Sequence, residues 1–436
     1  MSEHRTTAVR GELVHFLADP ATQARALEHF ADGVLVVRDG RIAECGPAPD
    51  LLRKLPAGTP LADHRGKLIL PGFVDTHVHY PQTDIIASHG EQLLEWLEKY
   101  TFPAERCFAD PVHAAEVAGF FCDELLKNGT TTAAAFATVH AASVDALFEA
   151  AQARRMRMIT GKVLMDRNCP DFLRDSAETG YAESKALIER WHNRDRLLYA
   201  ITPRFAPTST PAQMMLAGQL FREHAGVFLQ SHLAENRAEV EWVARLHPEA
   251  GSYLDVYARA GQLGMRAVFA HCIWLDDADR RRMAETGAAM SFCPTSNLFL
   301  GSGLFDLRRA RELGVRVGLG TDVGGGTSLS MLQTLNEAYK VLQLAGQSLS
   351  AASAFHLATL GGAHSLYLDD RIGNFAPGKE ADFVVLDPRA TPLLERRSAA
   401  CATLEERLFV LMMLGDDRAV AATWVMGTPA WQRPGP

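Results

Sequence analysis

The sequence contains few cysteines, and their spacing forms no metal or disulfide motif. There are 7 in 436 residues, and no Cys-x-x-Cys pair occurs. This excludes a structural zinc site built on such pairs and argues against a disulfide framework, so a reducing compartment is expected. Cys272 and Cys293 lie next to polar segments, and both are expected to be buried packing residues.

Long apolar runs and an excess of basic residues are also absent. No apolar run approaches the roughly 20 residues that a membrane-spanning helix requires. The N-terminal segment MSEHRTTAVRGELVHFLADP lacks the apolar core of a signal peptide. Lys and Arg number 44 against 52 Asp and Glu, a formal net charge of -8, which disfavours nucleic acid and anionic membranes as partners. We therefore expect a cytoplasmic protein that acts on a small molecule.

β-rich segments stand at both ends of the chain. Near the N-terminus, VRGELVHFLA is followed by GVLVVRDGRIAECG, in which Asp39-Gly40 between alternating apolar residues indicates a β-hairpin. Near the C-terminus, ADFVVLDP and AVAATWVMGTPAW have the same character. We therefore expect residues 1–70 and 371–436 to form one small structural β module together.

Apolar, strand-like runs alternate with helical stretches between those ends. Eight parallel strands with intervening helices are the count of a (β/α)₈ barrel, a TIM-type α/β fold whose active site lies at the C-terminal strand ends. Residues 71–370 are therefore predicted to form a catalytic barrel. The eight runs are LILPGFVDTHVH, TTTAAAF, MRMITGKVLM, LLYAITPRF, VFLQSHLAE, AVFAHCIW, AAMSFCPTSN and VRVGLGTDVGG.

Polar residues end several of these runs. His77 and His79 are separated by one residue, so a strand would point both imidazoles to the same side. His232, His271 and Asp322 end later runs. Each alone is interpreted as a strand-end cap or a hydrogen-bonded core residue, but together they indicate a metal site, because imidazole and carboxylate groups bind catalytic divalent metals. The predicted ligands are His77, His79, His232 and Asp322.

Glu235 lies three residues after His232, where the predicted strand becomes a loop. From there it can reach a water at the metal without being a ligand, which suits a general acid and base. The alternative is a carboxylate that stabilises the N-terminus of the helix expected at residues 236–246.

A helix expected over residues 91–101 has a buried face. Leu93, Leu97 and Tyr100 share one face of this helix. The helix either covers the pocket as a lid or simply packs against the barrel.

The metal motifs resemble the amidohydrolase superfamily, and the β-rich ends resemble its composite β-sandwich. Within that superfamily, the chain resembles the guanine deaminases in the segments HYPQT, GEQLLEWL and TPRF. This resemblance implies that the protein is a homodimer. The resemblance covers about residues 70–375, in the segments PGFVDTHVHYPQTD, GEQLLEWLEKYTFPAE, NGTTTAAAF, GKVLMD, TPRFAPT, SHLAENRAEVEWV, FAHCIWL, CPTSNLFLGSG and GLGTDVGGGTSLSM.

The resemblance implies a role for each matching residue. Glu235 would shuttle protons, His271 would polarise the attacking water or the intermediate, and Asp322 would orient that water. The same ligands accept iron or manganese, but the resemblance implies one zinc, bound by His77, His79, His232 and Asp322. The purine base would be bound by Gln82, Arg204, Phe205, His232, Glu235 and Asp322.

The implied reaction is hydrolytic deamination of guanine to xanthine and ammonia. Arg204 would hold the guanine carbonyl with its fork of donors. Phe205 would stack on the purine face, and Gln82 would offer a donor and an acceptor to the ring edge. The alternative interpretations are a salt bridge for Arg204, core packing for Phe205 and a turn residue for Gln82.

Other functions remain open. A sibling aminohydrolase acting on a triazine, cytosine or a thioadenosine-type nucleoside would share the metal ligands but need not share Gln82 or the Arg204-Phe205 pair. A binuclear hydrolase would need a carboxylated lysine, for which Lys162 is the nearby candidate. A non-catalytic scaffold would be expected to have lost ligands. The cytidine deaminase fold is excluded, because its Pro-Cys-x-x-Cys motif is absent.

Overall fold

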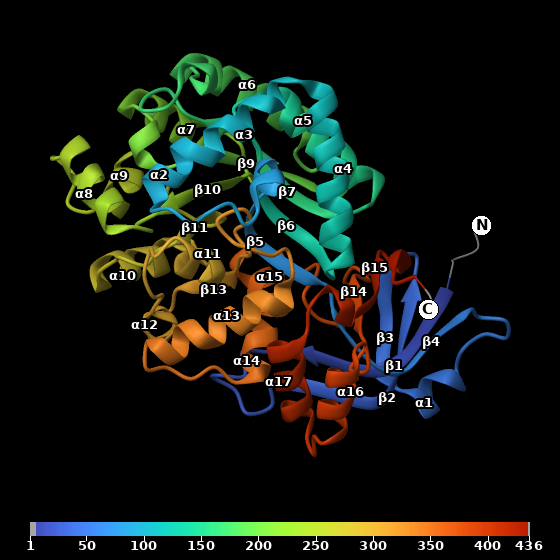
Figure 1. The fold of residues 1–436 in the computed structure, drawn as a ribbon. Helices are drawn as coiled ribbons and strands as arrows, with labels where there is room; N and C mark the ends of the chain where they lie inside the picture. Colours follow the sequence, from blue (N-terminus) through green and yellow to red (C-terminus); the bar gives the residue numbers. More distant parts are fainter. Residues whose placement is uncertain (1–5, 435–436) are drawn as a thin grey trace.

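In the computed structural model, two β-sheets organise residues 6–434, the part of the chain that is described (Figure 1). The larger sheet runs in the order β5-β6-β7-β9-β10-β11-β12-β13, and its strands pair in parallel. Every predicted run contributes a strand to it. These strands are β5 (Phe73–His79), β6 (Thr130–Phe136), β7 (Arg157–Gly161), the short β8 (Val163–Leu164) beside β9 (Leu197–Pro203), β10 (Phe228–Leu233), β11 (Ala267–His271), β12 (Ala289–Phe292) and β13 (Arg316–Leu319).

The first and last strands of this sheet meet, so the sheet forms a nearly closed barrel. The backbone N–H of Asp322 donates to the carbonyl of His77 at 2.9 Å, and that of His79 donates to the carbonyl of Val323 at 2.7 Å. Both bonds lie at the C-terminal end of β5. They hold the residues after β13 beside the two histidines, as a shared site requires.

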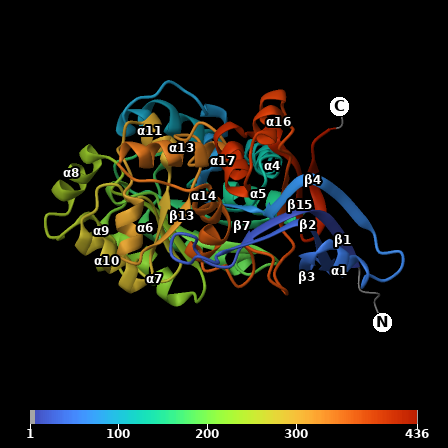
Figure 2. The ribbon, with the colours of Figure 1, turned by 90° about the horizontal axis from the view of Figure 1, so that it is seen from below.

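Helices surround the barrel and cover the outer face of its strands (Figures 1 and 2). Every residue of β5, β6 and β9 is buried, as expected for barrel strands that lie against helices. Among the described residues, no helix has the length and apolar character to cross a membrane. The helices of the barrel are α4 (Pro111–Lys127), α5 (Ala141–Ala153), α6 (Ala177–Trp191), α7 (Pro211–Glu223), α8 (Arg237–Leu246), α9 (Tyr253–Arg259), α10 (Asp277–Thr286), α11 (Pro294–Phe299), α12 (Leu307–Glu312), α13 (Met331–Leu344), α14 (Ala351–His356) and α15 (Gly362–Ser365).

The smaller sheet joins strands from both ends of the chain, as the sequence predicted. It is a mixed sheet in the order β16-β15-β14-β4-β1-β2-β3 and lies to one side of the barrel in both views (Figures 1 and 2). Asp39 and Gly40 link β2 to β3 with φ of 52° and 81°, as a tight hairpin turn requires. The strands are β1 (Thr6–Phe16), β2 (Leu27–Arg38), β3 (Arg41–Pro47), β4 (Leu61–Pro71), β14 (Phe383–Leu386), β15 (Val420–Val425) and β16 (Thr428–Gln432).

The predicted first run, LILPGFVDTHVH, spans two strands rather than one. β4 ends at Pro71 in the smaller sheet, and β5 begins at Phe73 in the barrel. Gly72 separates them, and a Cβ at this position would lie 2.2 Å from Oγ1 of Thr131. Only glycine therefore fits where the chain passes from the module to the barrel.

The terminal segments also contain helices that the β-rich interpretation did not include. α1 (Ala48–Leu52) follows β3, and the C-terminal segment holds α16 (Pro392–Ala399) and α17 (Leu404–Leu414). Thr391 and Thr403 cap α16 and α17 by accepting backbone N–H bonds. The module is thus a mixed sheet with attached helices.

A buried group of charges joins the module to the N-terminal end of the barrel. Arg157, at the start of β7, and Arg196, just before β9, both pair with Glu380. Arg196 also pairs with Asp382, which precedes β14. Because both acids come from the C-terminal segment, these pairs hold it against the barrel. We propose that residues 71–370 form the barrel domain and that residues 1–70 and 371–436 form the second, composite domain.

Candidate active site

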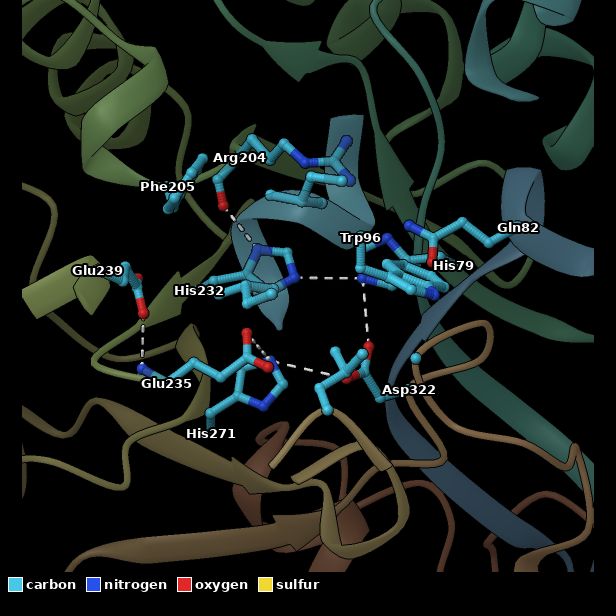
Figure 3. A pocket seen from close by; sticks show the side chains of 14 residues that line it. His79, Gln82, Trp96, Arg204, Phe205, His232, Glu235, Glu239, His271 and Asp322 are labelled. Carbon is cyan, nitrogen blue, oxygen red and sulfur yellow. Dashed lines mark hydrogen bonds and ion pairs between the residues drawn. The ribbon is translucent and has the colours of Figure 1, made fainter. Parts of the chain in front are cut away.

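The predicted metal ligands converge at the C-terminal ends of the barrel strands. His77 and His79 come from β5, His232 from β10, and Asp322 follows β13. The Nε2 atom of His79 lies 3.2 Å from the Nε2 atoms of both His77 and His232, and Oδ1 of Asp322 lies 3.1 Å from Nε2 of His77. Each residue offers one ligand atom, and these atoms all lie within 4.8 Å of one another. Figure 3 shows His79, His232 and Asp322 pointing toward one another.

The protonation of this cluster suits a cation. Burial lowers the pKa of His79 to about 3 and that of His232 well below its ordinary value, so both rings are neutral. Burial opposes the ionisation of Asp322, but the electrostatic interaction with His77 and the hydrogen bonds with His77 and His79 outweigh it, so the pKa of Asp322 is well below the usual range. Nδ1 of His232 donates to the carbonyl of Arg204 at 2.6 Å, which leaves the Nε2 lone pair facing the other ligands. Neutral imidazoles at His79 and His232 beside one carboxylate fit a divalent metal.

Three residues of the site have a left-handed backbone, which is uncommon outside glycine. The φ angles of Ala234, His271 and Asp322 are 51°, 69° and 51°. All three lie where a barrel strand turns into its loop. Such conformations are retained where the surrounding structure enforces them, and they cluster at functional sites.

Glu235 and His271 face the metal ligands, as predicted. Nε2 of His271 lies 3.3 Å from Oε2 of Glu235 and 3.6 Å from Oδ2 of Asp322. Nδ1 of His271 lies 3.0 Å from Oδ1 of Asn297 and donates to it. Nε2 has no hydrogen-bond partner among the described residues. His271 presents this nitrogen to the space between the carboxyl groups of Glu235 and Asp322.

The environment of Glu235 suits proton transfer. Burial and, second, the negative charge of Asp322 raise its pKa to about 8, although the Ser302 hydroxyl donates to Oε1 at 3.0 Å. A carboxyl group with a pKa near neutrality can both accept and release a proton. Glu235 precedes α8, which begins after its N-cap Asn236, and the carboxylate in the first turn is Glu239. The helix-stabilising alternative therefore applies to Glu239.

The predicted purine contacts Gln82, Arg204 and Phe205 line the same pocket (Figure 3). Nη1 of Arg204 lies 2.7 and 2.8 Å from the two carboxylate oxygens of Glu105. Oε1 of Gln82 accepts the backbone N–H of Gly324 at 3.0 Å, and Gln82 also interacts with Glu105, which opposes the rise that burial causes in the pKa of this carboxyl group. One buried acid thus interacts with two side chains of the pocket.

The segment for which the sequence left a lid and simple packing as alternatives contributes a wall of this pocket. It is built from α2 (Leu93–Trp96), a π-helical turn (Leu97–Thr101) and α3 (Phe102–Arg106), which follow one another without a break. The apolar wall is completed by Phe205, whose ring lies 6.1 Å from that of Trp242 at 75°. The side chains that this segment contributes to the pocket are Leu93, Trp96 and Leu97.

Several residues of the site were missed by the sequence interpretation. Glu239 had a detectable signal, because Asn236 followed by Glu at the third helical position has the spacing of a capping box. Glu105 ends the segment GEQLLEWLEKYTFPAE, which matched the resemblance, but its role had no local signal, since its partner Arg204 is 99 residues away. Trp96 and Asn297 lie in segments that matched the resemblance but had been assigned no role.

Lys162 and the two cysteines have structural surroundings. Nζ of Lys162 pairs with Asp175 and lies 3.4 Å from Glu183, so the amine is held by two carboxylates. This removes the candidate for a carboxylated lysine. Cys272 and Cys293 are both buried, as expected.

Comparisons with known proteins identify the class that this fold and site define. A family model described as "Amidohydrolase family" matches residues 68–430. The chain belongs to the amidohydrolase family.

Within that family, the chain belongs with the guanine deaminases. Guanine deaminase of Escherichia coli is 54% identical over 434 residues, 99% of each chain. The solved E. coli guanine deaminase superposes with a TM-score of 0.97, covering 98% of this chain and 100% of that one. A guanine deaminase from C. acetobutylicum with bound guanine in the active site is 31% identical, with a TM-score of 0.88 and coverage of 97% and 99%. Human guanine deaminase is 36% identical over 83% of this chain and 82% of its own.

Proposed function

We propose that this chain hydrolyses guanine to xanthine and ammonia at one metal ion per chain. The observation that carries the proposal is the arrangement of Gln82 and Arg204, which share the buried Glu105 and line one pocket with the predicted metal ligands. The metal ligands alone would suit other aminohydrolases. A donor fork beside an amide suits a purine that has a ring carbonyl next to a ring N–H.

The metal that we propose is zinc, held by the side chains of the converging cluster. Three imidazole nitrogens and one carboxylate oxygen are a zinc donor set, although iron and manganese accept the same groups. A divalent ion bound here would lower the pKa of a bound water to about 7 and so would supply a nucleophile at neutral pH. The proposed ligands are His77, His79, His232 and Asp322.

The attacking water is contacted by three side chains with different roles, those of Glu235, His271 and Asp322. Asp322 accepts a hydrogen bond from this water and orients it toward carbon 2 of guanine. Glu235 takes a proton from the water and delivers it to ring nitrogen 3, and the attack produces a tetrahedral intermediate at carbon 2. His271 polarises the attacking oxygen from the other side. Transfer of the second proton to the amino group lets ammonia leave, so one guanine and one water yield one xanthine and one ammonia.

The side chains that select guanine are Arg204, Gln82 and Phe205, which line the pocket beside the metal ligands. Arg204 uses Nη1 to contact Glu105, which leaves the rest of its fork for the guanine carbonyl. Gln82 pairs with the ring edge, and Phe205 stacks on the ring face. A site built around substrate hydrogen bonds rejects an analogue that lacks them by about 10⁴ to 10⁵. His232, Glu235 and Asp322 contact the reacting end of the base.

A substrate panel tests this proposal. Metal-replete protein is incubated separately with guanine, adenine, cytosine, an amino-triazine and a thioadenosine nucleoside, while ammonia and the deaminated product are measured. Guanine should release ammonia and xanthine in equal amounts, with kcat/KM at least about 10³ above that of the other compounds. Turnover of another heterocycle without turnover of guanine would favour the sibling aminohydrolase, and no turnover at all would favour a scaffold.

The resemblance to guanine deaminases also supports the proposal of a cytoplasmic homodimer. Light scattering of the purified protein should yield a mass about twice that of the 47.7 kDa chain. A mass of one chain would contradict the dimer. Fractionation of the source cells would test the compartment.

A further inference from the structure

We propose that Glu239 is a positioning residue that holds Glu235 in the orientation that proton transfer requires. This inference rests on the proposed function, in which Glu235 carries the protons. Glu239 is fully buried in α8 and lines the pocket, yet no step of the proposed reaction uses it.

One carboxylate oxygen of Glu239 holds the backbone at Glu235. Oε2 accepts the N–H of Glu235 at 2.8 Å and the N–H of Asn236 at 3.0 Å; Figure 3 shows the first of these bonds. Ala234, immediately before, has the uncommon φ of 51°. Glu235 therefore lies in a turn between β10 and α8, and the side chain of Glu239 holds the backbone of this turn through hydrogen bonds.

The other carboxylate oxygen holds Glu239 itself. Oε1 accepts a hydrogen bond from the hydroxyl of Tyr253 at 2.7 Å, and Tyr253 is buried at the start of α9. The ring of Tyr253 stacks on that of Tyr257, at 5.9 Å and 17°. The hydroxyl of Tyr257 donates to the carbonyl of His232 at 2.7 Å. Two tyrosines of one helix thus support both ends of the segment that contains the ligand His232 and the acid Glu235.

A capping box by itself does not account for this arrangement. The same motif begins α17, where Oε2 of Glu406 accepts the N–H of Ala402 at 2.6 Å and that of Thr403 at 3.3 Å, but Glu406 is exposed to solvent. Glu239 performs the same cap in a buried position beside a second carboxyl group. Burial and the charge of Glu235 oppose its ionisation and raise its pKa to about 7. A carboxyl group that caps a helix in a buried position, next to a second carboxyl group, costs folding stability. Glu239 therefore serves the reaction by positioning Glu235.

The matched pair of capping boxes supplies the experiment. Glu239→Ala, Glu239→Gln and Tyr253→Phe are compared with wild type and with the control Glu406→Ala for kcat and KM on guanine, bound metal and melting temperature. Because a misplacement of about 1 Å can cost about 10²-fold in rate, Glu239→Ala should lower kcat by about 100-fold, with KM within about threefold of wild type and the metal retained. Glu239→Gln keeps the acceptor and should restore kcat to within about tenfold, and Tyr253→Phe should lower it by about tenfold. Glu406→Ala should leave kcat unchanged.

The outcomes separate this inference from the proposed function. If Glu239→Ala folds and keeps the wild-type kcat, or loses activity only in proportion to lost metal, Glu239 is a helix cap and the inference fails. If Glu239→Ala does not fold, the inference stands or falls on Tyr253→Phe and Glu239→Gln: wild-type kcat in both, with metal retained, would overturn it. If wild-type protein itself releases no ammonia from guanine, the proposed function fails instead.

Discussion

Glu105 and Arg204 form a buried ion pair in which both carboxylate oxygens lie against one guanidinium nitrogen, at 2.7 and 2.8 Å. Glu105 is 0% exposed and Arg204 is 2% exposed. Gln82, which accepts the backbone N–H of Gly324, also interacts with the same acid, so the two side chains assigned to the purine edge are oriented before substrate enters. Such pre-organisation lowers the cost of binding and sharpens the choice between analogues.

Replacing Arg204 with lysine should weaken recognition of the guanine carbonyl. Lysine keeps a positive charge beside Glu105 but lacks the fork of donors. Loss of one hydrogen bond from a charged group should lower kcat/KM for guanine by about 100-fold and that for 2,6-diaminopurine, which has no such carbonyl, by less than about threefold. Parallel steady-state kinetics on both bases provide the measurement. Equal losses on the two bases would mean that Arg204 does not read the carbonyl.

Glu235→Gln should separate metal binding from turnover. The amide retains the size of the side chain but cannot carry a proton, so kcat should fall by about 10² to 10⁴ while the bound metal stays at the wild-type level. The matched control is Glu241→Gln, the same exchange at an exposed position of α8, which should leave kcat unchanged. Near-wild-type turnover by Glu235→Gln would remove Glu235 from the proton pathway.

The contribution of Glu235 to the stability of the metal-free protein should fall as pH rises between about 4.5 and 8. In the folded protein the pKa of Glu235 is raised from the ordinary 4.5 to about 8, mainly by burial. Between these values the folded protein keeps a proton that the unfolded chain has released, so a rise in pH favours unfolding. This contribution is fully present below pH 4.5 and lost above pH 8. Urea unfolding of chelator-treated protein across this pH range should show that Glu235→Gln gains stability relative to wild type as the pH rises; a difference between the two proteins that does not change with pH would contradict the raised pKa.

Glu380→Ala should destabilise the fold without altering the site. Glu380 pairs with Arg157 and Arg196 in a buried position where the C-terminal segment meets the barrel. Removing one partner of a buried pair leaves uncompensated charge, so we expect a loss of about 3–5 kcal/mol in the free energy of unfolding. Denaturant unfolding measures this loss, and Arg53→Ala, which breaks an exposed pair, serves as the control. Equal stability of the two variants would show that the cluster does not hold the segment.

The barrel and its metal ligands could be predicted because local signals coincide there. Several of the buried strands are apolar runs that end in polar residues, and His77 and His79 share a face by simple alternation. The segment that carries His232 and Glu235 ends in a capped helix, which also has a local signature. These features depend on residues that are close in sequence.

Contacts between distant segments could not be predicted in this way. Glu105 lies in a segment that resembles the guanine deaminases, but no local pattern assigns it a partner, and only packing brings it to Arg204. Gly72 divides an apolar run that is continuous in sequence, because the chain changes sheets there. The C-terminal helices α16 and α17 were not predicted, because the apolar β-strand segments before and after them gave the stronger sequence signal.

Titration of metal-free protein with zinc tests the central claim most directly. Aliquots receive from none to about three equivalents of zinc per chain, and the rate of xanthine formation from guanine is measured in each. One site formed by His77, His79, His232 and Asp322 predicts a linear rise in rate that ends at one equivalent. A rise that continues to two equivalents, or a zinc-loaded protein that forms no xanthine, would contradict the account.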